Sequence, residues 1–540
     1  MMFLPVLFAC LDPNPQESGG GWALRWRLDG GTALEGFGRG IAGISDLEGD
    51  SASDVIVGIE GWDGVVESSG KVTVYSGATG LAIFEFVGTE FLGSLGHSVA
   101  NVGDVNGDGV EDIAGGAPFE SPGGAAYVWS GADGRVLHRF TRSEIGAIYG
   151  RYIAGAGDVD GDGAADVLVG SERSSVFGPA AGASFVYSGA TGAQLLVLGQ
   201  SAARNAQDGD GLGDINADGL ADLVISDFLN GGSVAVYSGA DGSVLYRIPS
   251  VAPFDGFGGS LANIRDIDRD GVNDFIVGAP APQAGVRKGR AYVYSGVSGM
   301  LLMDLRGNVD HDEFGFDVAG GMDVNGDGYP DMVVGAHFGG SLEQGAAFVH
   351  SGLDGRLLAE LVGETPFDLF GHAVAMTPDV NSDGLGDVVV YSHGADYGAS
   401  NAGSVNLLEL HSYLTADPRK VSAAAGETVT FALDFPDSEA GKVWQLLLST
   451  DRAGQITIGG VHIPLMLSPL LRRTLLDPPA IFSSTSGVLD PSGDAMTIAT
   501  LAAGQASAWV GFTLRFAAVS LDLPSNPRLS SAGVRIAVVP

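Results

Sequence analysis

The sequence predicts an all-β protein, a seven-bladed β-propeller followed by a small C-terminal β-sandwich. Three observations lead to this prediction. A nine-residue acidic motif recurs seven times, at intervals of 52 to 58 residues. Short β-branched or aliphatic runs separated by Gly-rich turns follow each copy. The last copy lacks one strand, which the start of the chain can supply. Self-similarity at this period indicates a repeat architecture.

The composition agrees with many tight turns around a packed core. Of the 540 residues, 45% are hydrophobic, and the 86 glycines follow no G-X-Y period. The formal net charge of −38 argues against a nucleic acid as partner, because a phosphate backbone would be repelled. The same charge argues against electrostatic docking on an anionic membrane surface.

Each repeat contains the same features in the same order. An aromatic–Gly or Leu–Gly pair, such as Phe37-Gly38, stands nine residues before the motif, although the fourth repeat has Asn205-Ala206 there. An apolar run such as DFIVGAP (274–280), a run ending in Ser-Gly, a turn and a further strand follow the motif. Four such strands cannot bury both faces of a sheet, whereas a ring of seven sheets can.

The two ends of the repeat array complement one another. The seventh repeat ends at SVNLLEL (404–410) without the Ser-Gly turn and outer strand of its siblings. We therefore expect WALRWRL (22–28) to complete the last blade and protect its edge. The predicted organisation is a leader and linker (1–21), a propeller (22–410), a linker (411–420) and an alternating, turn-rich β-sandwich (421–540).

The N-terminal run MMFLPVLFAC ends at Cys10, the single cysteine of the chain. It resembles the end of a secretory signal, with Cys10 as a candidate for lipidation, so we expect export to the cell surface, the envelope or the extracellular space. A misplaced start codon or a merely apolar terminus is the alternative. No later segment approaches the roughly 20 apolar residues of a membrane span.

The acidic motif has the spacing of a calcium-binding loop. Side-chain oxygens at positions 1, 3, 5 and 9 and the carbonyl at position 7 can converge on one hard cation, and Gly at position 6 allows the sharp bend. Calcium is favoured over magnesium, which tolerates crowded all-protein cages poorly. An EF-hand is excluded, because it needs Glu at position 12 and flanking helices. The alternative is a set of Asx-rich turns without metal.

We predict about six structural Ca²⁺ ions. The side-chain ligand positions of the seven loops hold 24 carboxylates, and these like charges repel one another unless a cation is bound. The predicted ligands are Asp104, Asn106, Asp108, Val110, Asp112; Asp158, Asp160, Asp162, Ala164, Asp166; Asp214, Asn216, Asp218, Leu220, Asp222; Asp266, Asp268, Asp270, Val272, Asp274; Asp323, Asn325, Asp327, Tyr329, Asp331; and Asp379, Asn381, Asp383, Leu385, Asp387. The first loop (Asp46, Glu48, Asp50, Asp54) should bind weakly, since Ser51 replaces the bend glycine.

The Phe-Gly pair, the DxDxDGxxD loop and the endings GGAP (115–118) and VGAP (277–280) resemble FG-GAP repeats. Such repeats form the propeller of integrin α subunits and of related bacterial surface proteins. The resemblance covers about residues 22–410. It implies a calcium-stabilised, exported binding or adhesion protein that recognises a protein or a glycan.

A partner would bind the propeller face opposite the acidic loops, where loop length and content vary. The candidate partner-face residues are Trp62, Phe119, Phe177, Phe228, Arg287, Lys288, Arg290, Phe338 and Tyr397. The alternative is that these side chains only hold their own loops in place. No G-x-S-x-G or H-E-x-x-H motif occurs, so the sequence favours a protein that is not an enzyme. A polysaccharide lyase or hydrolase that uses the propeller channel, or a structural envelope component, remains an alternative.

Overall fold

The computed structural model describes most of the chain from Trp22 onward. The residues outside the description are 1–21, 65, 200–204, 228–231, 252–254, 281–287, 308, 341, 411–413, 418–419, 423–426, 435–442, 451–455, 459–460, 464–485, 489–493, 502–512, 523–525, 531–533 and 540. All regular elements in the described residues are β-strands. The described part of the chain contains no helix that could span a membrane.

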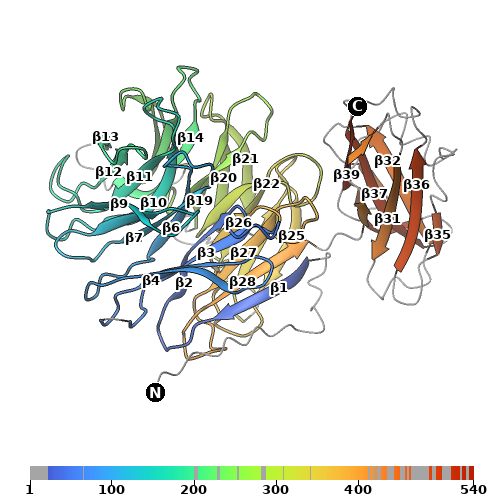
Figure 1. The fold of residues 1–540 in the computed structure, drawn as a ribbon, viewed down its shortest axis with the longest axis horizontal. Coiled ribbons are helices and arrows are strands. Elements are labelled where there is room, and N and C mark those ends of the chain that lie inside the picture. Colours follow the sequence, from blue (N-terminus) through green and yellow to red (C-terminus); the bar gives the residue numbers. More distant parts are fainter. Residues whose placement is uncertain are drawn as a thin grey trace.

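Seven antiparallel four-stranded sheets form the larger part of the protein (Figure 1). Each sheet is built from consecutive strands, apart from the seventh. From the inner to the outer strand, the sheets are β2 (Phe37–Ile44), β3 (Asp54–Ile59), β4 (Lys71–Tyr75), β5 (Ala82–Val87); β6 (Ser98–Gly103), β7 (Asp112–Ala117), β8 (Ala125–Trp129), β9 (Val136–Thr141); β10 (Tyr149–Gly157), β11 (Asp166–Ser171), β12 (Ala183–Tyr187), β13 (Gln194–Leu198); β14 (Asn205–Gly213), β15 (Asp222–Asp227), β16 (Ser233–Tyr237), β17 (Val244–Pro249); β18 (Leu261–Arg265), β19 (Asp274–Ala279), β20 (Arg290–Tyr294), β21 (Leu301–Arg306); β22 (Val318–Met322), β23 (Asp331–Ala336), β24 (Ala346–His350), β25 (Leu357–Val362); and β26 (Phe370–Thr377), β27 (Asp387–Ser392), β28 (Ser404–Leu410), β1 (Trp22–Asp29).

The inner strands form a closed circle. Contacts run from β2 to β6, β10, β14, β18, β22 and β26, and from β26 back to β2. At the seam, the Ser53 N–H donates to the carbonyl oxygen of Asp379 over 2.9 Å. The predicted seven-bladed β-propeller is therefore confirmed.

Strands from both ends of the array make up the seventh sheet. β1 pairs antiparallel with β28, from Trp22 opposite Leu410 to Asp29 opposite Ser404. The indole Nε1 of Trp26 donates to the carbonyl oxygen of Gly77 in the first repeat over 2.8 Å. The N-terminal strand thus joins the seventh sheet and also contacts the first one.

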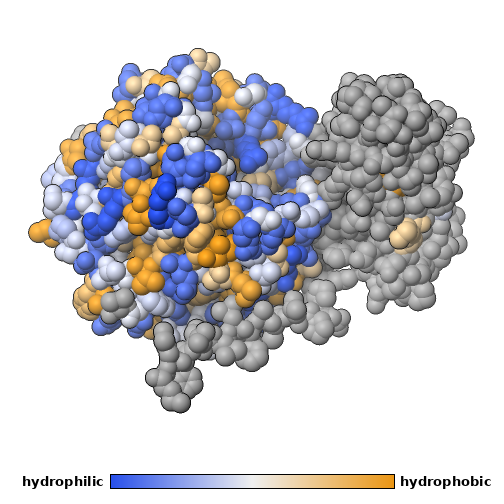
Figure 2. All heavy atoms as spheres, in the orientation of Figure 1, coloured by the Kyte–Doolittle hydropathy of each residue, from blue (hydrophilic) through white to orange (hydrophobic). Residues whose placement is uncertain are grey.

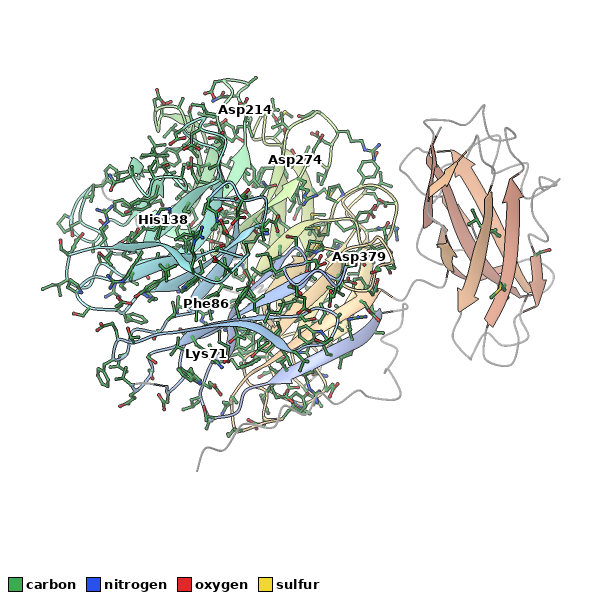
Figure 3. All side chains as sticks on the ribbon, viewed as in Figure 1. Lys71, Phe86, His138, Asp214, Asp274 and Asp379 are labelled. Atoms are coloured by element: carbon green, nitrogen blue, oxygen red, sulfur yellow. The ribbon has the colours of Figure 1, made fainter. Side chains whose placement is uncertain are left out.

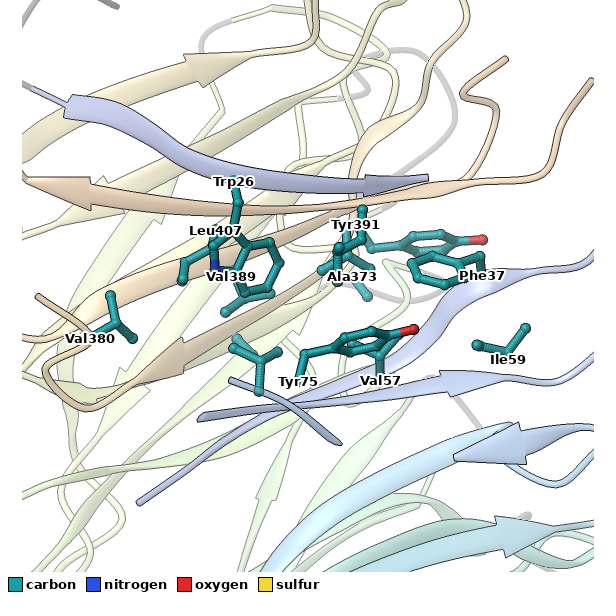
Figure 4. Close-up of a cluster of buried hydrophobic side chains, with 14 residues drawn as sticks. Trp26, Phe37, Val57, Ile59, Tyr75, Ala373, Val380, Val389, Tyr391 and Leu407 are labelled. Carbon is teal, nitrogen blue, oxygen red and sulfur yellow. The ribbon is translucent and has the colours of Figure 1, made fainter. Parts of the chain in front are cut away.

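Among the described residues of the propeller, the core lies between neighbouring sheets, with one apolar cluster at each of the seven interfaces. In the cluster between the seventh and first sheets, Phe37 packs against Tyr75 with ring centroids 6.3 Å apart, beside Trp26 and Tyr391 (Figure 4). Phe37 belongs to a Phe-Gly pair, and the aromatic members of the other pairs are also buried: Tyr149, Phe257, Phe314 and Phe370. The repeated aromatic residue therefore fills the space between two blades. On the side seen in Figure 2, apolar and polar patches alternate over the propeller surface.

The C-terminal segment is described only in part, so the predicted β-sandwich remains a prediction. Its sheets have the strand orders β29-β31-β36, β30-β39-β37-β32-β35 and β33-β34, and β38 pairs with β37. The strands are β29 (Leu414–Asp417), β30 (Lys420–Ser422), β31 (Glu427–Asp434), β32 (Val443–Thr450), β33 (Ile456–Ile458), β34 (Val461–Ile463), β35 (Ser486–Val488), β36 (Asp494–Leu501), β37 (Thr513–Asp522), β38 (Asn526–Ser530) and β39 (Val534–Val539). The predicted leader, with Cys10, lies outside the described residues.

Candidate metal-binding loops

Each acidic motif forms the loop between the first and second strands of its sheet. The second loop, for example, joins β6 to β7 and ends at Asp112, the first residue of β7. All seven inner strands run in the same direction along the propeller axis. The loops that follow them therefore share one face of the propeller. Asp214, Asp274 and Asp379, labelled in Figure 3, belong to the fourth, fifth and seventh loops.

The first aspartate of each loop holds the turn together. In the second loop, Asp104 Oδ1 accepts the N–H of Gly107 at 2.7 Å, and Oδ2 accepts the N–H of Gly109 at 2.7 Å. The bond from the position-6 N–H to Oδ2 of the first aspartate is present in all seven loops, at 2.5–2.9 Å. These backbone N–H groups converge on the carboxylate and set the curl of the loop.

The ninth residue, always Asp, ties the loop to its own sheet. One of its oxygens accepts the N–H of position 2 in all seven loops, at 2.7–3.0 Å. In six repeats its other oxygen accepts the N–H of the Ser-Gly turn glycine, at 2.9–3.2 Å. A Cβ on these glycines would lie 1.8–2.0 Å from the carbonyl oxygen of loop position 8. The Ser-Gly turn therefore belongs to the site, and its glycine is sterically required.

The backbone at loop positions 4 and 6 is left-handed in every repeat. Position 6 is Gly in six loops, and in the first loop Ser51 adopts a φ of 74°. Position 4 carries Ala217, Arg269 and Ser382 in three loops, with φ values of 62°, 65° and 62°. Such residues cost conformational free energy in this region, which the surrounding hydrogen bonds must offset.

Burial and neighbouring carboxylates raise the pKa of the ninth aspartate. Its side chain is essentially buried in all seven loops. Burial is the largest cause, the two backbone donors oppose it, and the other loop carboxylates add to it. The pKa rises to about 7 for Asp54 and to about 6 for Asp112, Asp166 and Asp274, and it is raised as well for Asp222, Asp331 and Asp387.

The donor set fits a hard cation best in the third and fifth loops. The carboxylates of Asp158, Asp160 and Asp166 each place an oxygen within 4.8 Å of the others. Asp266, Asp268 and Asp274 do the same in the fifth loop. All of these ligand atoms are oxygens, as Ca²⁺ and Mg²⁺ prefer.

Asn at position 3 gives the second, fourth and sixth loops a different contact. There the amide Nδ2 of Asn106, Asn216 or Asn325 lies 3.3–3.4 Å from Oδ1 of the ninth aspartate. A half turn of the amide would present its oxygen instead. In the seventh loop, Asn381 Nδ2 donates to Glu409 at 3.1 Å. The Asn loops therefore relieve part of the charge repulsion by themselves.

Sequence reasoning missed one polar group at this face, the hydroxyl of the Ser-Gly turn. The Oγ atoms of Ser76, Ser238 and Ser351 lie 3.4–3.5 Å from the position-5 carboxylates of their repeats. The recurrence of Ser-Gly in six repeats was the signal that could have revealed it.

The candidate partner-face residues differ in solvent exposure and in their contacts with the rest of the protein. Phe119 and Phe338 follow the second strands β7 and β23 and are 53% and 37% exposed. Lys288 is exposed as well. Each of these strands begins at the acidic loop of its repeat, so these phenylalanines lie at the opposite face.

The other candidates are held within the protein. Trp62 and Phe177 are partly buried against apolar clusters. The Tyr397 hydroxyl donates to Asp368 over 2.8 Å. Arg290 pairs with Asp304 at 3.1 Å, so it is not a free cationic spot. Phe228 and Arg287 lie outside the described residues.

Comparison with known proteins adds evidence on the repeats. The family model of the FG-GAP repeat matches residues 95–129, 257–294 and 314–350, which fall in the second, fifth and sixth repeats. The chain is 26% identical over 251 residues to "Integrin alpha-V" of Gallus gallus, an alignment that covers 45% of this chain and 20% of that protein. It is 31% identical over 155 residues to "Integrin alpha-4" of Xenopus laevis, covering 26% and 15% of the two chains. It is 32% identical over 169 residues to "Integrin alpha-3" of Cricetulus griseus, covering 29% and 16%. The matches thus span only 15–20% of the length of these relatives.

Proposed function

Because the chain carries an FG-GAP, integrin-alpha-like β-propeller, we propose that it is a calcium-stabilised binding or adhesion protein that acts outside the cell. Its propeller would recognise a protein or a glycan and would catalyse no reaction. The similarity to integrin alpha chains supports the binding role. The acidic loops support the dependence on calcium.

The observation that carries the calcium proposal is the close approach of the carboxylates in the third and fifth loops. A bound cation would neutralise charges that otherwise repel one another at the buried ends of β11 and β19. The ligands would be the oxygens at positions 1, 3, 5, 7 and 9 of each loop. In this proposal the ions hold the loops and do not take part in a reaction.

A partner would bind the face opposite these loops. Phe119 and Phe338 present exposed aromatic surface there, and aromatic side chains often dominate the binding energy of an interface. Lys288 would add a positive charge to this face. The varied loop content around these residues supports recognition rather than a purely structural role.

The test compares partner capture by the full chain with capture by two variants, on a glycan array and in a pull-down from extracellular matrix. The double substitution F119S/F338S should abolish capture. V136S is the matched control, because Val136 is 57% exposed but follows the Ser-Gly turn near the acidic loops. Equal capture by both variants would contradict the proposed face.

A further inference from the structure

A cavity of ≈ 770 Å³ lies along the axis of the propeller, and inner-strand residues from all seven repeats line it. Its volume is in the range of cavities that bind small organic molecules. The residues seven places before each acidic loop form a ring at the end of the cavity away from these loops. This mouth ring consists of Arg39, His97, Arg151, Gln207, Gly259, Phe316 and His372.

Three aspartates of the cavity lining already accept hydrogen bonds from backbone N–H groups of neighbouring sheets. Asp208 and Asp210 accept the N–H groups of Leu261 and Asn263 in the next sheet, at 2.8 and 2.9 Å. Asp317 accepts the N–H of Val374 at 2.8 Å in the same way. These carboxylates satisfy backbone donors that an inner edge strand would otherwise leave unpaired.

Most charged groups of the mouth ring are also paired. Arg151 Nε lies 3.3 Å from Glu172 Oε2, and its guanidinium contacts Nε2 of His97. His97 Nδ1 lies 2.5 Å from Glu60 Oε2. Burial lowers the pKa of the His97 imidazole, and the hydrogen bond to Glu60 opposes this shift. Because Nε2 faces the Arg151 guanidinium, Nδ1–H is the donor to Glu60.

Arg39 is paired through only one of its three guanidinium nitrogens. Its Nε lies 3.6 Å from Glu60 Oε1, and no other acidic group of the described residues lies within ion-pair distance of its guanidinium. No hydrogen bond joins its two terminal nitrogens to another described residue. Burial first, and the Arg39 charge second, lower the pKa of His372 and His393 in the seventh repeat. The positive charge of Arg39, on the first sheet, therefore reaches the histidines of the seventh sheet at the mouth of the cavity.

We propose that the mouth of the axial cavity binds the carboxylate of an acidic sugar, a uronate, through Arg39. The planar fork of a guanidinium matches a carboxylate with two parallel hydrogen bonds. An arginine side chain with an open fork is notable in a protein of net charge −38. Because the mouth ring lies on the face opposite the acidic loops, this inference rests on the proposed function and names a ligand class for it, at residues other than Phe119 and Phe338.

The rest of the mouth offers groups that suit a sugar ring. Phe316 packs against His372 with ring centroids 4.9 Å apart, and both line the cavity beside Arg39. The half-buried Phe316 ring can contact the C–H face of a pyranose, and the Gln207 amide can bond its hydroxyls.

The test is isothermal titration of the full calcium-loaded chain with D-glucuronate and digalacturonate. Galactose and an oligoglutamate peptide are the matched neutral and peptide probes. Both uronates should bind, and the other two should not. R39Q should weaken binding about tenfold or more, as expected for the loss of a charge-assisted pair. R135Q should leave it unchanged, because Arg135 is 61% exposed in a Ser-Gly turn, outside the cavity lining.

A second substitution should increase the affinity for uronates, which a misfolded variant could not do. E60Q removes the carboxylate that pairs with Arg39 while keeping an acceptor for His97, so uronate affinity should rise several-fold. Uronates that bind no better than galactose, equal affinity in R39Q and the wild type, or preferred binding of the oligoglutamate peptide would each overturn the proposal. Because the outer-loop test uses F119S/F338S, failure of one proposal is distinguishable from failure of the other.

Discussion

Tyr152 of the third sheet fills the space that a side chain at Gly209 of the fourth sheet would occupy. A Cβ on Gly209 would lie 2.6 Å from the Tyr152 hydroxyl oxygen, which bonds to Ser184 Oγ at 2.7 Å. In the other six repeats the place of Tyr152 is taken by Gly, Ala, Ser or Asp, and that of Gly209 by Ile, Val or Leu. The two exceptional residues therefore compensate for each other at this blade interface.

The substitution G209V, which restores the residue type of the other repeats, should destabilise the protein. Overpacking of a fitted contact costs about 1–3 kcal/mol. Urea unfolding in saturating calcium would measure this loss. The double substitution Y152S/G209V should recover part of it, since the phenol is then absent. An unchanged midpoint for G209V would contradict the fit of these two blades.

Trp26 should be a main determinant of ring closure. Its indole is buried between the seventh and first sheets and bonds to Gly77. W26A should cost about 3–5 kcal/mol, as large-to-small changes of buried aromatics do. W26F should cost less, because it keeps most of the apolar contact and loses the hydrogen bond. Equal unfolding midpoints for both variants and the wild type would show that β1 contributes little to closure.

Amide groups at position 3 should reduce the dependence on a cation. In the third and fifth loops this position is Asp160 or Asp268, whose charges help to raise the pKa of Asp166 and Asp274. D160N/D268N should therefore raise the melting temperature measured in EDTA and narrow its difference from that in calcium. N106D/N216D, the reverse change in two other loops, should widen the difference. Equal differences in all three proteins would contradict the electrostatic argument.

Asp208 should make stability fall as the pH rises in the calcium-loaded protein. The pKa of this carboxyl is raised to about 8, well above the usual value, and burial is the largest cause of this rise. The protonated form is thus favoured in the folded state. Its stabilising contribution is complete at low pH and is lost as the pH rises through about 8. D208N should flatten the decline between about pH 4, near the usual pKa of an aspartate, and about pH 8 in chemical unfolding experiments. Parallel curves for the two proteins would exclude this role.

The sequence predicted the propeller because its regularities are local and repeated. The Asp and Gly spacing of each loop, the Phe-Gly pairs and the missing strand of the seventh repeat all lie within short segments. Contacts between repeats were not predictable in this way. Tyr152 and Gly209 are 57 residues apart, and their complementarity arises from packing across a blade interface.

The acidic loops illustrate the same limit within the candidate site. Their ligand positions followed from the spacing of oxygen-bearing residues. The left-handed backbone at position 4 was hidden, because Ala217, Arg269 and Ser382 occupy it in three loops. Likewise, Arg290 was predicted as a partner-face residue, but it pairs with Asp304 on the adjacent strand, and only the fold brings the two together. Pairing across strands depends on register, which composition does not reveal.

The most direct test of calcium as the stabilising ion is a thermal melt of the same sample in EDTA and after the addition of calcium. Ligand binding to the folded state raises its stability with ligand concentration. We predict a markedly lower melting temperature in EDTA, full recovery with calcium and a smaller recovery with magnesium. Identical melting temperatures in EDTA and in calcium would contradict the proposal that these carboxylate loops are closed by calcium.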